Sequence, residues 1–335
     1  MNTPKYLTMT DIAHMTHNGN IVAMVEEFQK NTSLFNTIPW KQASDALSDV
    51  TGVVGELPTA TWVGLDKGVK PTKGTWEKRE ENIALVESWS VYNEKTYKIA
   101  GHGDRARWEN DRLHIVAMGL EAEEKLLYGN PDVDINQPLG FMPRMDKVTD
   151  MYAMKSGERQ KHVCLSCSGS TANGESSILL IANGPQSSRL LYPRHKANNG
   201  LEFNAFPFEN DKDDEGGYIR TAKSQFIMSF GLSIANRQSV ARIANIDTSS
   251  STSIGNIADA LYEAFASFPK EYRASVQIWT TPKVILAMRK LYAGRVNAIP
   301  SYDNAIYKNA IGDVMFDNFV MHQCDSMLDT EAVVS

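Results

Sequence analysis

The chain has 335 residues, of which 42% are hydrophobic and 22% are charged, with a net charge of −6 and a pI near 5.7. These proportions are typical of a folded globular protein that is long enough for two or more subdomains. The acidic balance argues against a general nucleic-acid binder, which carries a basic face, and no run of eighteen apolar residues is present to span a membrane.

Cysteine usage and the first residues indicate a compartment. Three cysteines, Cys164, Cys167 and Cys324, are too few for a disulfide scaffold and suit a reducing environment. The first twenty residues lack the apolar stretch of a signal peptide, so we expect none. We therefore expect a soluble, mixed α/β protein of the cytosol.

Residues 1–52 predict short helices joined by loops, an arm more than a core. Thr10 caps a helix that Asn18-Gly19-Asn20 interrupts, and apolar residues at helical spacing follow from Ile21 to Phe28.

A long two-stranded ribbon is predicted next. LPTATWVGL (Leu57–Leu65) and ENIALVESWSVYNEKTY (Glu81–Tyr97) alternate apolar and polar residues, and the tip between them carries Lys67, Lys70 and Lys73. An isolated hairpin is marginal in water, so either the rest of the chain or another molecule must cover the ribbon. A solvated loop of mixed charge is the alternative for the tip.

Start and stop signals predict a helix over 104–129, roughly 36 Å long. Beyond it, the patterns predict further elements in this order: strands at 163–168, 177–183 and 188–193; an acidic exposed loop at 208–217; a strand at 226–234; a Ser/Thr-rich break at 248–253; a helix at 257–268; a strand at 275–280; a helix at 282–294; and strands at 314–324.

Two small groups of residues raise the question of a metal or redox site. Cys164 and Cys167 have C-x-x-C spacing, with His162 two residues upstream. Zinc needs four ligands, no second pair is present, and residues three apart on a strand point to opposite faces. We interpret the cysteines as buried structural thiols, with metal or redox chemistry as the open alternative. His14 and His17 lack a third ligand nearby.

Other catalytic patterns are missing from the sequence. It contains no phosphate-binding glycine loop, no nucleophile elbow and no carboxylate pair in an apolar setting. We therefore expect no enzyme activity, no cofactor and no metal.

Three segments carry a resemblance to a known family. They are LPTATWVGLDKGVKPTKGTW (Leu57–Trp76), GLSIANRQSVARIANID (Gly231–Asp247) and CDSMLDTEAVVS (Cys324–Ser335). In this order, and over nearly the whole chain, the sequence resembles the major capsid proteins of tailed bacteriophages. Within that family it is similar to the branch that contains the capsid protein of Salmonella phage epsilon 15.

The resemblance implies an α+β chain with the Hong Kong 97-type major capsid fold. Its parts would be an N-terminal arm (1–52), an extended β-hairpin loop or E-loop (53–100), a P domain with spine helix 104–129 and long strands (101–250), and an A domain with the C-terminal strands (251–335). The implied function is self-assembly into hexamers and pentamers of an icosahedral shell that encloses double-stranded DNA and matures from a procapsid.

The resemblance also implies partners. They are other copies of the chain, a portal protein at one vertex and a small decoration or staple protein, with weak non-specific contact to packaged DNA and no membrane. The protein would reside in the virion after assembly in the bacterial host cytoplasm. Some relatives crosslink a loop lysine to a neighbouring asparagine, but nothing here identifies such a lysine.

We predict inter-subunit contacts from the aromatic and basic side chains of the E-loop, since aromatic residues dominate interface energetics, and hinges where glycines precede the spine helix. The contact residues are Trp62, Lys67, Lys70, Lys73, Trp76 and Trp89; the hinge residues are Gly101 and Gly103. Two other classes remain open: a soluble enzyme that uses the C-x-x-C pair, and a binding module that adds a strand to its partner.

Overall fold

A computed structural model describes most of the chain: residues 32–56, 58–99, 103–149, 162–170, 174–184, 187–194, 200–212, 216–296, 314–316 and 319–335. The chain forms two compact units, each made of separate stretches. Unit 1 comprises Met1–Asp49, Glu81–Phe141 and Arg189–Ser233; unit 2 comprises Val50–Glu80, Met142–Ser188 and Ile234–Ser335. The four domains implied by the family are consecutive segments, and their boundaries remain predictions.

The first sheet is built on a long antiparallel pair, β3 (Thr75–Asn93) and β9 (Tyr218–Ile234). Their register runs from Ile83 opposite Gly231 to Asn93 opposite Thr221. The strand order is β1-β6-β9-β3-β2, and β7 and β8 also pair with β9. The remaining strands are shorter than these two: β1 (Trp40–Gln42), β2 (Ser48–Glu56), β6 (Ser188–Tyr192), β7 (Leu201–Ala205) and β8 (Glu209–Lys212).

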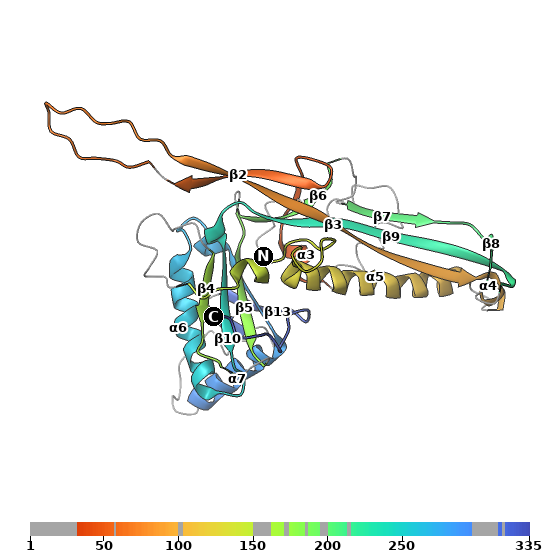
Figure 1. Cartoon of the computed structure of the whole chain (residues 1–335). Helices are drawn as coiled ribbons and strands as arrows, with labels where there is room; N and C mark the ends of the chain where they lie inside the picture. The colour runs from red at the N-terminus through yellow and green to blue at the C-terminus, as the bar shows by residue number, and fades with distance from the viewer. Residues whose placement is uncertain are drawn as a thin grey trace. The chain divides into compact units, whose positions relative to one another are not determined.

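The long helix α5 (Gly103–Tyr128) confirms the helix predicted over 104–129. In Figure 1 it lies along β3 and β9. Its buried apolar side chains are Ile115, Met118, Ala122, Leu126 and Leu127. Gly129 ends it, where an added Cβ would lie 2.4 Å from the Lys125 carbonyl oxygen, so the chain turns where no side chain fits.

Polar bonds also fasten α5 to the sheet. Ser88 Oγ lies 2.9 Å from His114 Nδ1, and Asn110 Nδ2 donates to Ser90 Oγ at 2.7 Å. Asp111 is buried and accepts a bond from Ser224 Oγ at 3.0 Å. Serines at these strand positions are small, so they let the helix come close while they satisfy its polar side chains.

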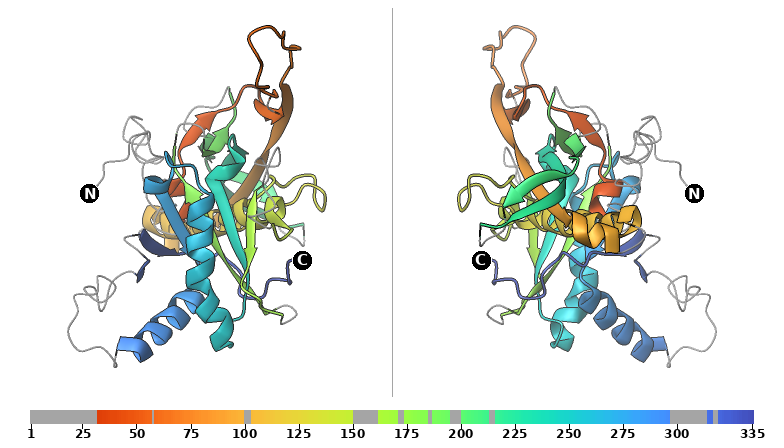
Figure 2. Two further views of the ribbon diagram at one scale, coloured as in Figure 1. Left: turned by 90° about the vertical axis from the view of Figure 1, so that its left-hand side faces the viewer. Right: turned by 90° about the vertical axis from the view of Figure 1, so that its right-hand side faces the viewer.

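Unit 2 contains a six-stranded sheet in the order β12-β13-β11-β5-β10-β4. Every residue of β5 and β10 is buried. Figures 1 and 2 show α6 beside these strands, and residues of α6 and α7 share one apolar cluster with one face of the sheet. The elements are β4 (Val163–Ser166), β5 (Ser176–Ala182), β10 (Val240–Ile246), α6 (Ser251–Ser267), β11 (Val276–Thr280), α7 (Pro282–Val296), β12 (Val314–Phe316) and β13 (Phe319–Gln323).

The other face of this sheet meets a segment without helix or strand, Cys324–Ser335, which we call the strap. Glu331 of the strap forms both backbone hydrogen bonds of an isolated bridge with Glu175. Ala241 and Ile243 belong to the apolar cluster that the sheet shares with α6 and α7. Arg242 lies between them in the strand and therefore points to the opposite face, toward the strap. The strap therefore covers polar as well as apolar groups.

The predicted ribbon is wrong in its details. Its first strand is β2, which ends at Glu56, and residues 58–74 contain no strand. Alternation in that loop does not make a strand, because a strand needs a hydrogen-bonded neighbour. The second strand begins at Thr75 and ends at Asn93, after which Glu94–Ile99 is the helix α4. The Asn93 side chain accepts from the Lys95 backbone N–H at 2.8 Å and so starts this helix.

Half of this ribbon is also covered by its own chain. The backbone of residues Ile83–Asn93 of β3 pairs with β9, so this part of the ribbon does not stand alone. The alternation of β3 does not show this, because the partner strand lies more than 100 residues later.

Three other predictions are corrected. The acidic loop at 208–217 contains β8, because Glu209–Lys212 pairs with β9 and Asp211 forms an ion pair with Lys223. The Ser/Thr-rich break at 248–253 is partly helix: α6 starts at Ser251, capped by the Ser250 side chain. In the predicted arm, residues 1–31 lie outside the described part. Leu34 and Phe35, in the helix α3 (Leu34–Thr37), are buried in a core.

Candidate assembly surface

The segment between β2 and β3, residues 58–74, is a loop held by its own bonds; we call it the exposed loop. A turn joins the Lys67 backbone N–H to the Gly64 carbonyl at 3.1 Å. Across the loop, Thr72 Oγ1 donates to the Thr59 carbonyl at 2.9 Å. These bonds keep a hairpin shape without a strand ladder.

Apolar side chains of this loop are left in solvent. Trp62 is 102% exposed and Leu65 is 107% exposed, and Val69 is also exposed. Large apolar side chains normally gain free energy when they leave water, and tryptophan contributes the most contact area. The loop is thus a surface that the described chain does not cover.

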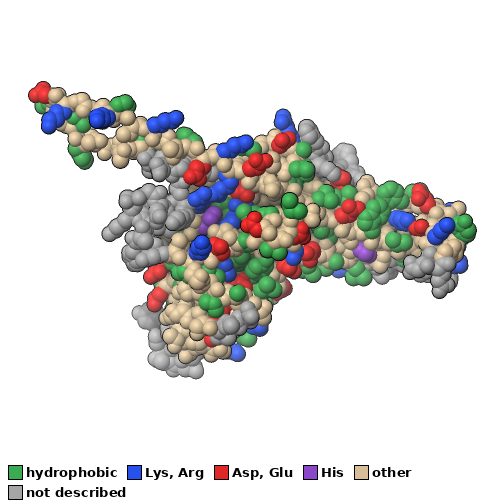
Figure 3. Space-filling view, viewed as in Figure 1, with side chains coloured by type: hydrophobic (Ala, Val, Ile, Leu, Met, Phe, Trp, Pro, Cys, Tyr) green, Lys and Arg blue, Asp and Glu red, His purple; other side chains and the backbone are tan. Residues whose placement is uncertain are grey.

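Three lysines lie on the same loop. Lys67, Lys70 and Lys73 are all exposed. Figure 3 shows this segment at the upper left of the view, with basic and apolar side chains next to each other along it. Such a mixture of aromatic and cationic groups suits a partner surface that offers both apolar contact and carboxylates.

The other two predicted tryptophans differ from Trp62. Trp76 is 73% exposed and lies over Gly52 of β2. Trp89 is 43% exposed, because its ring stacks on Phe206 of the same chain at 5.7 Å and its Nε1 donates to Glu87. The three residues therefore do not form one cluster: the predicted set spreads along the ribbon.

Trp89 belongs to a second exposed apolar surface, which we call the outer strip. It comprises Leu85, Trp89 and Val91 of β3, all exposed. Their alternation places them on the face opposite Ser88 and Ser90, which face α5. Sequence reasoning grouped these residues on one face but did not show that this face is the one in solvent.

The predicted hinge is only partly described. Gly103 is the first residue of α5, and Gly101 lies outside the described residues. The hinge therefore stays a prediction.

The C-x-x-C pair is confirmed as buried thiols. Cys164 and Cys167 are 0% exposed and unbonded to each other. Burial raises the pKa of Cys164 to about 11 and that of Cys167 to about 12, so neither is a thiolate at neutral pH. Within the described ranges, no group of three His, Cys, Asp or Glu residues is placed to hold a metal ion. His14 and His17 lie outside those ranges.

His162, two residues before Cys164, is half-buried. Desolvation, with the positive charges of Arg144, Arg79 and Arg237, lowers the pKa of His162 to about 3. Its ring is therefore neutral at neutral pH and is not poised to exchange protons there.

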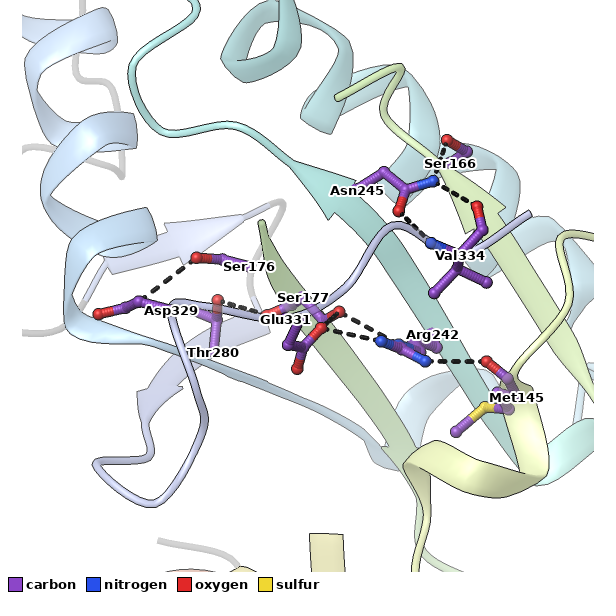
Figure 4. A network of polar contacts seen from close by, with 10 residues as sticks. All are labelled: Met145, Ser166, Ser176, Ser177, Arg242, Asn245, Thr280, Asp329, Glu331 and Val334. Carbon is purple, nitrogen blue, oxygen red and sulfur yellow. Dashed lines mark hydrogen bonds and ion pairs between the residues drawn. The ribbon is translucent and has the colours of Figure 1, made fainter. Parts of the chain in front are cut away.

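Sequence reasoning missed a buried polar network at the strap. Arg242 of β10 is 5% exposed and Glu331 of the strap is 6% exposed, and their nearest side-chain atoms are 2.8 Å apart (Figure 4). The available signal was a single arginine within the apolar run of β10, since a charge in a buried strand needs a partner. Both residues lie in segments that carry the family resemblance.

Comparison with known proteins identifies the class of protein that has this fold, and then its family. One solved structure, that of bacteriophage Epsilon15, is similar with a TM-score of 0.62 and 16% identity, covering 89% of this chain and 88% of that one. At this identity the likeness shows the fold: the chain has the Hong Kong 97-type fold of phage capsid proteins. The family model for major capsid protein GP7 matches residues 16–335, and the chain therefore belongs to that family.

Other comparisons are weaker. The bacteriophage JBD30 capsid has a TM-score of 0.49 and 10% identity, covering 88% of this chain and 91% of that one. No curated protein matches the chain in sequence. Among the described helices, none combines the length and the apolar composition that a membrane crossing requires.

The family settles the class of function. A major capsid protein is a structural component of the virion that associates with copies of itself to form the shell, and the family is not an enzyme family. The C-x-x-C enzyme and the strand-addition module are therefore not favoured.

Proposed function

We propose that the chain forms hexamers and pentamers of an icosahedral shell around double-stranded DNA, and that each subunit binds its neighbour through the exposed loop. The observation that carries this proposal is the complete exposure of Trp62 and Leu65. A side chain of that size, held out by a structured loop, gains free energy when a second copy covers it.

The energetics suit many modest contacts. A standard interface buries about 1,200–2,000 Å², and apolar area contributes roughly 25 cal/mol per Å² before the losses of association. Each subunit of a shell meets several neighbours, so weak contacts add up to a persistent container. Trp62 and Trp76 are the proposed anchors near the loop. Trp89 contributes from the outer strip, where Leu85 and Val91 extend the apolar area.

Lys67, Lys70 and Lys73 are proposed to steer the contact more than to stabilise it. Exposed ion pairs contribute little to affinity but raise association rates and suppress wrong partners. Assembly should therefore slow as salt rises, while finished shells change little.

Gly101 and Gly103 are proposed as a hinge that lets the ribbon change its angle between pentamers and hexamers. Replacing both with proline restricts that motion, because proline fixes the backbone φ angle. Shells of unchanged size and yield from the double variant would count against the hinge.

The remaining partners follow the family. We propose a portal protein at one vertex, a small decoration or staple protein, and assembly in the host cytoplasm. The net charge of −6 supports weak contact with packaged DNA, since phosphate binding requires basic surfaces.

The exposed loop is tested with Trp62→Ala and Leu65→Ser, alone and together. We expect the variants to fold normally, by circular dichroism, but to remain small assemblies by size-exclusion chromatography and negative-stain microscopy. Leu113→Ser is the matched control, because Leu113 on α5 is also exposed, at 67%, but lies outside the proposed surface. Shells formed by the double loop variant at wild-type yield would overturn the proposed contact.

A further inference from the structure

The strap contains the counter-ion of a charge that is buried in the middle of unit 2. Arg242 lies centrally in β10, with β4 on one side and β5 on the other. The guanidinium cannot lose its proton at physiological pH, so burial of this side chain requires partners for its charge and its N–H groups.

The partners come from three segments (Figure 4). Arg242 Nε donates to Ser177 Oγ at 3.1 Å, and Nη1 donates to the Met145 carbonyl at 2.9 Å. Nη2 donates to Glu331 Oε2 at 2.8 Å, and Ser177 Oγ donates to the same carboxylate oxygen. Of these three partners, Glu331 alone carries a negative charge, so the strap neutralises Arg242.

Further bonds hold the strap in place. Asn245 Nδ2 donates to the Val334 carbonyl at 2.8 Å, and the Val334 backbone N–H donates to Asn245 Oδ1 at 2.8 Å. Asn245 has a φ of 57°, a left-handed conformation that asparagine tolerates better than most residues. The Val148 backbone N–H donates to the Ser335 carbonyl at 3.2 Å. The Asn245 side chain thus makes the two hydrogen bonds with the Val334 backbone that a neighbouring strand would otherwise make.

The partners of this ion pair lie far apart along the chain, and their order affects folding. Glu331 follows Arg242 by 89 residues, so the sheet strands β4, β5 and β10 are all made well before the carboxylate that neutralises their arginine. Until the strap is present, closing that face of the sheet buries a charge without its counter-ion, which is strongly unfavourable.

We propose that the strap is a latch that makes the folding of unit 2, and therefore entry into shells, conditional on a chain that extends through Glu331 and Val334. Chains that lack a working strap leave the β4–β10–β5 face open. They are lost to proteolysis or aggregation and are not built into the shell. The latch does not depend on which surface the exposed loop binds, because all of its groups belong to one unit of one chain.

The test compares two carboxylates of the strap. Glu331→Gln keeps the shape of the side chain but removes its negative charge, so that the charge of Arg242 is left without a counter-ion. Asp329→Asn is the matched control, since Asp329 makes a 2.9 Å ion pair with Lys283, whose side chain is 61% exposed. Each variant is co-expressed with the wild-type chain, and its fraction in purified shells is measured by mass spectrometry. We expect Glu331→Gln to be several-fold under-represented relative to its share of synthesis, and Asp329→Asn to enter in proportion.

Hydrogen exchange locates the effect. In Glu331→Gln we expect faster exchange of the β10 amides, with the α5 amides unchanged, because the latch acts within unit 2. Proportional entry into shells together with wild-type exchange of β10 would overturn the proposal.

A second variant decides the case in which Glu331→Gln does not fold at all. Arg242→Met combined with Glu331→Met removes both charges and keeps the apolar volume, a replacement that often preserves or raises stability. Recovery of soluble chains that enter shells supports the latch. If the double variant yields no such chains, neutralisation of Arg242 is not what the strap supplies, and the proposal is wrong.

Discussion

The exposed loop and the strap are both irregular segments, yet they treat their side chains in opposite ways. In the strap, Cys324 is 0% exposed and Met327 is 4% exposed, and Glu331 is paired inside the chain. In the exposed loop, Trp62 and Leu65 are completely in solvent. Absence of helix or strand therefore says little about order: the strap completes its own subunit, whereas the loop leaves its apolar groups for a neighbour.

Of the predicted effects, that of acid on the subunit interior is expected to be the largest. The pKa of His162 is lowered to about 3 from 6.5, so the unfolded chain binds a proton that the folded chain refuses between those values. Stability is thus fully present above pH 6.5 and is lost as pH falls toward 3, by at most about 5 kcal/mol. Denaturant unfolding measured at intervals from pH 7 to pH 4 checks this.

Other groups also titrate in that range, so the control is His162→Gln, which removes the imidazole. The variant should lose less stability than the wild type over the same pH interval. Identical slopes for the two proteins would show that His162 is not the group responsible.

The hydrogen bonds of Asn245 give the next largest effect. Asn245→Ala removes two hydrogen bonds to Val334 and a third to Ser166 Oγ, and it places alanine at a φ of 57°. We expect a loss of about 2–3 kcal/mol in the free energy of unfolding. Asn245→Gly removes the same bonds but tolerates that φ, so it should lose about 1 kcal/mol less. Equal losses would mean that backbone conformation contributes nothing here.

The smallest expected changes in stability are those of two tryptophan substitutions, which differ from each other. Trp89→Ala loses the stacked contact with Phe206 and should reduce the stability of the isolated subunit by about 1 kcal/mol. Trp62→Ala should change it by less than about 0.5 kcal/mol, because Trp62 is 102% exposed. Urea denaturation of unassembled subunits measures both. A larger loss for Trp62→Ala than for Trp89→Ala would mean that the loop is packed within its own chain.

Sequence reasoning identified many elements because their signals are local. The caps and stops around α5 lie within a few residues of its ends, and the apolar spacing of α6 and β9 reflects faces that are in fact buried. The buried thiols followed from the apolar neighbours of Cys164 and Cys167 in the same way. The resemblance, carried by three short segments, extended this local reading to the family, which the match over residues 16–335 confirms.

Only the tertiary structure decided the pairings. Alternation predicted strands at 57–65 and 81–97, but a strand forms where a neighbour completes its hydrogen bonds, and β9 completes them for Ile83–Asn93 and not for residues 58–74. Likewise nothing near Arg242 in the sequence announces Glu331, because their contact depends on how the strap crosses the sheet. The sequence by itself determined the local elements and the family; long-range contacts, which local patterns do not encode, decided which groups stay inside the subunit and which are left for another copy.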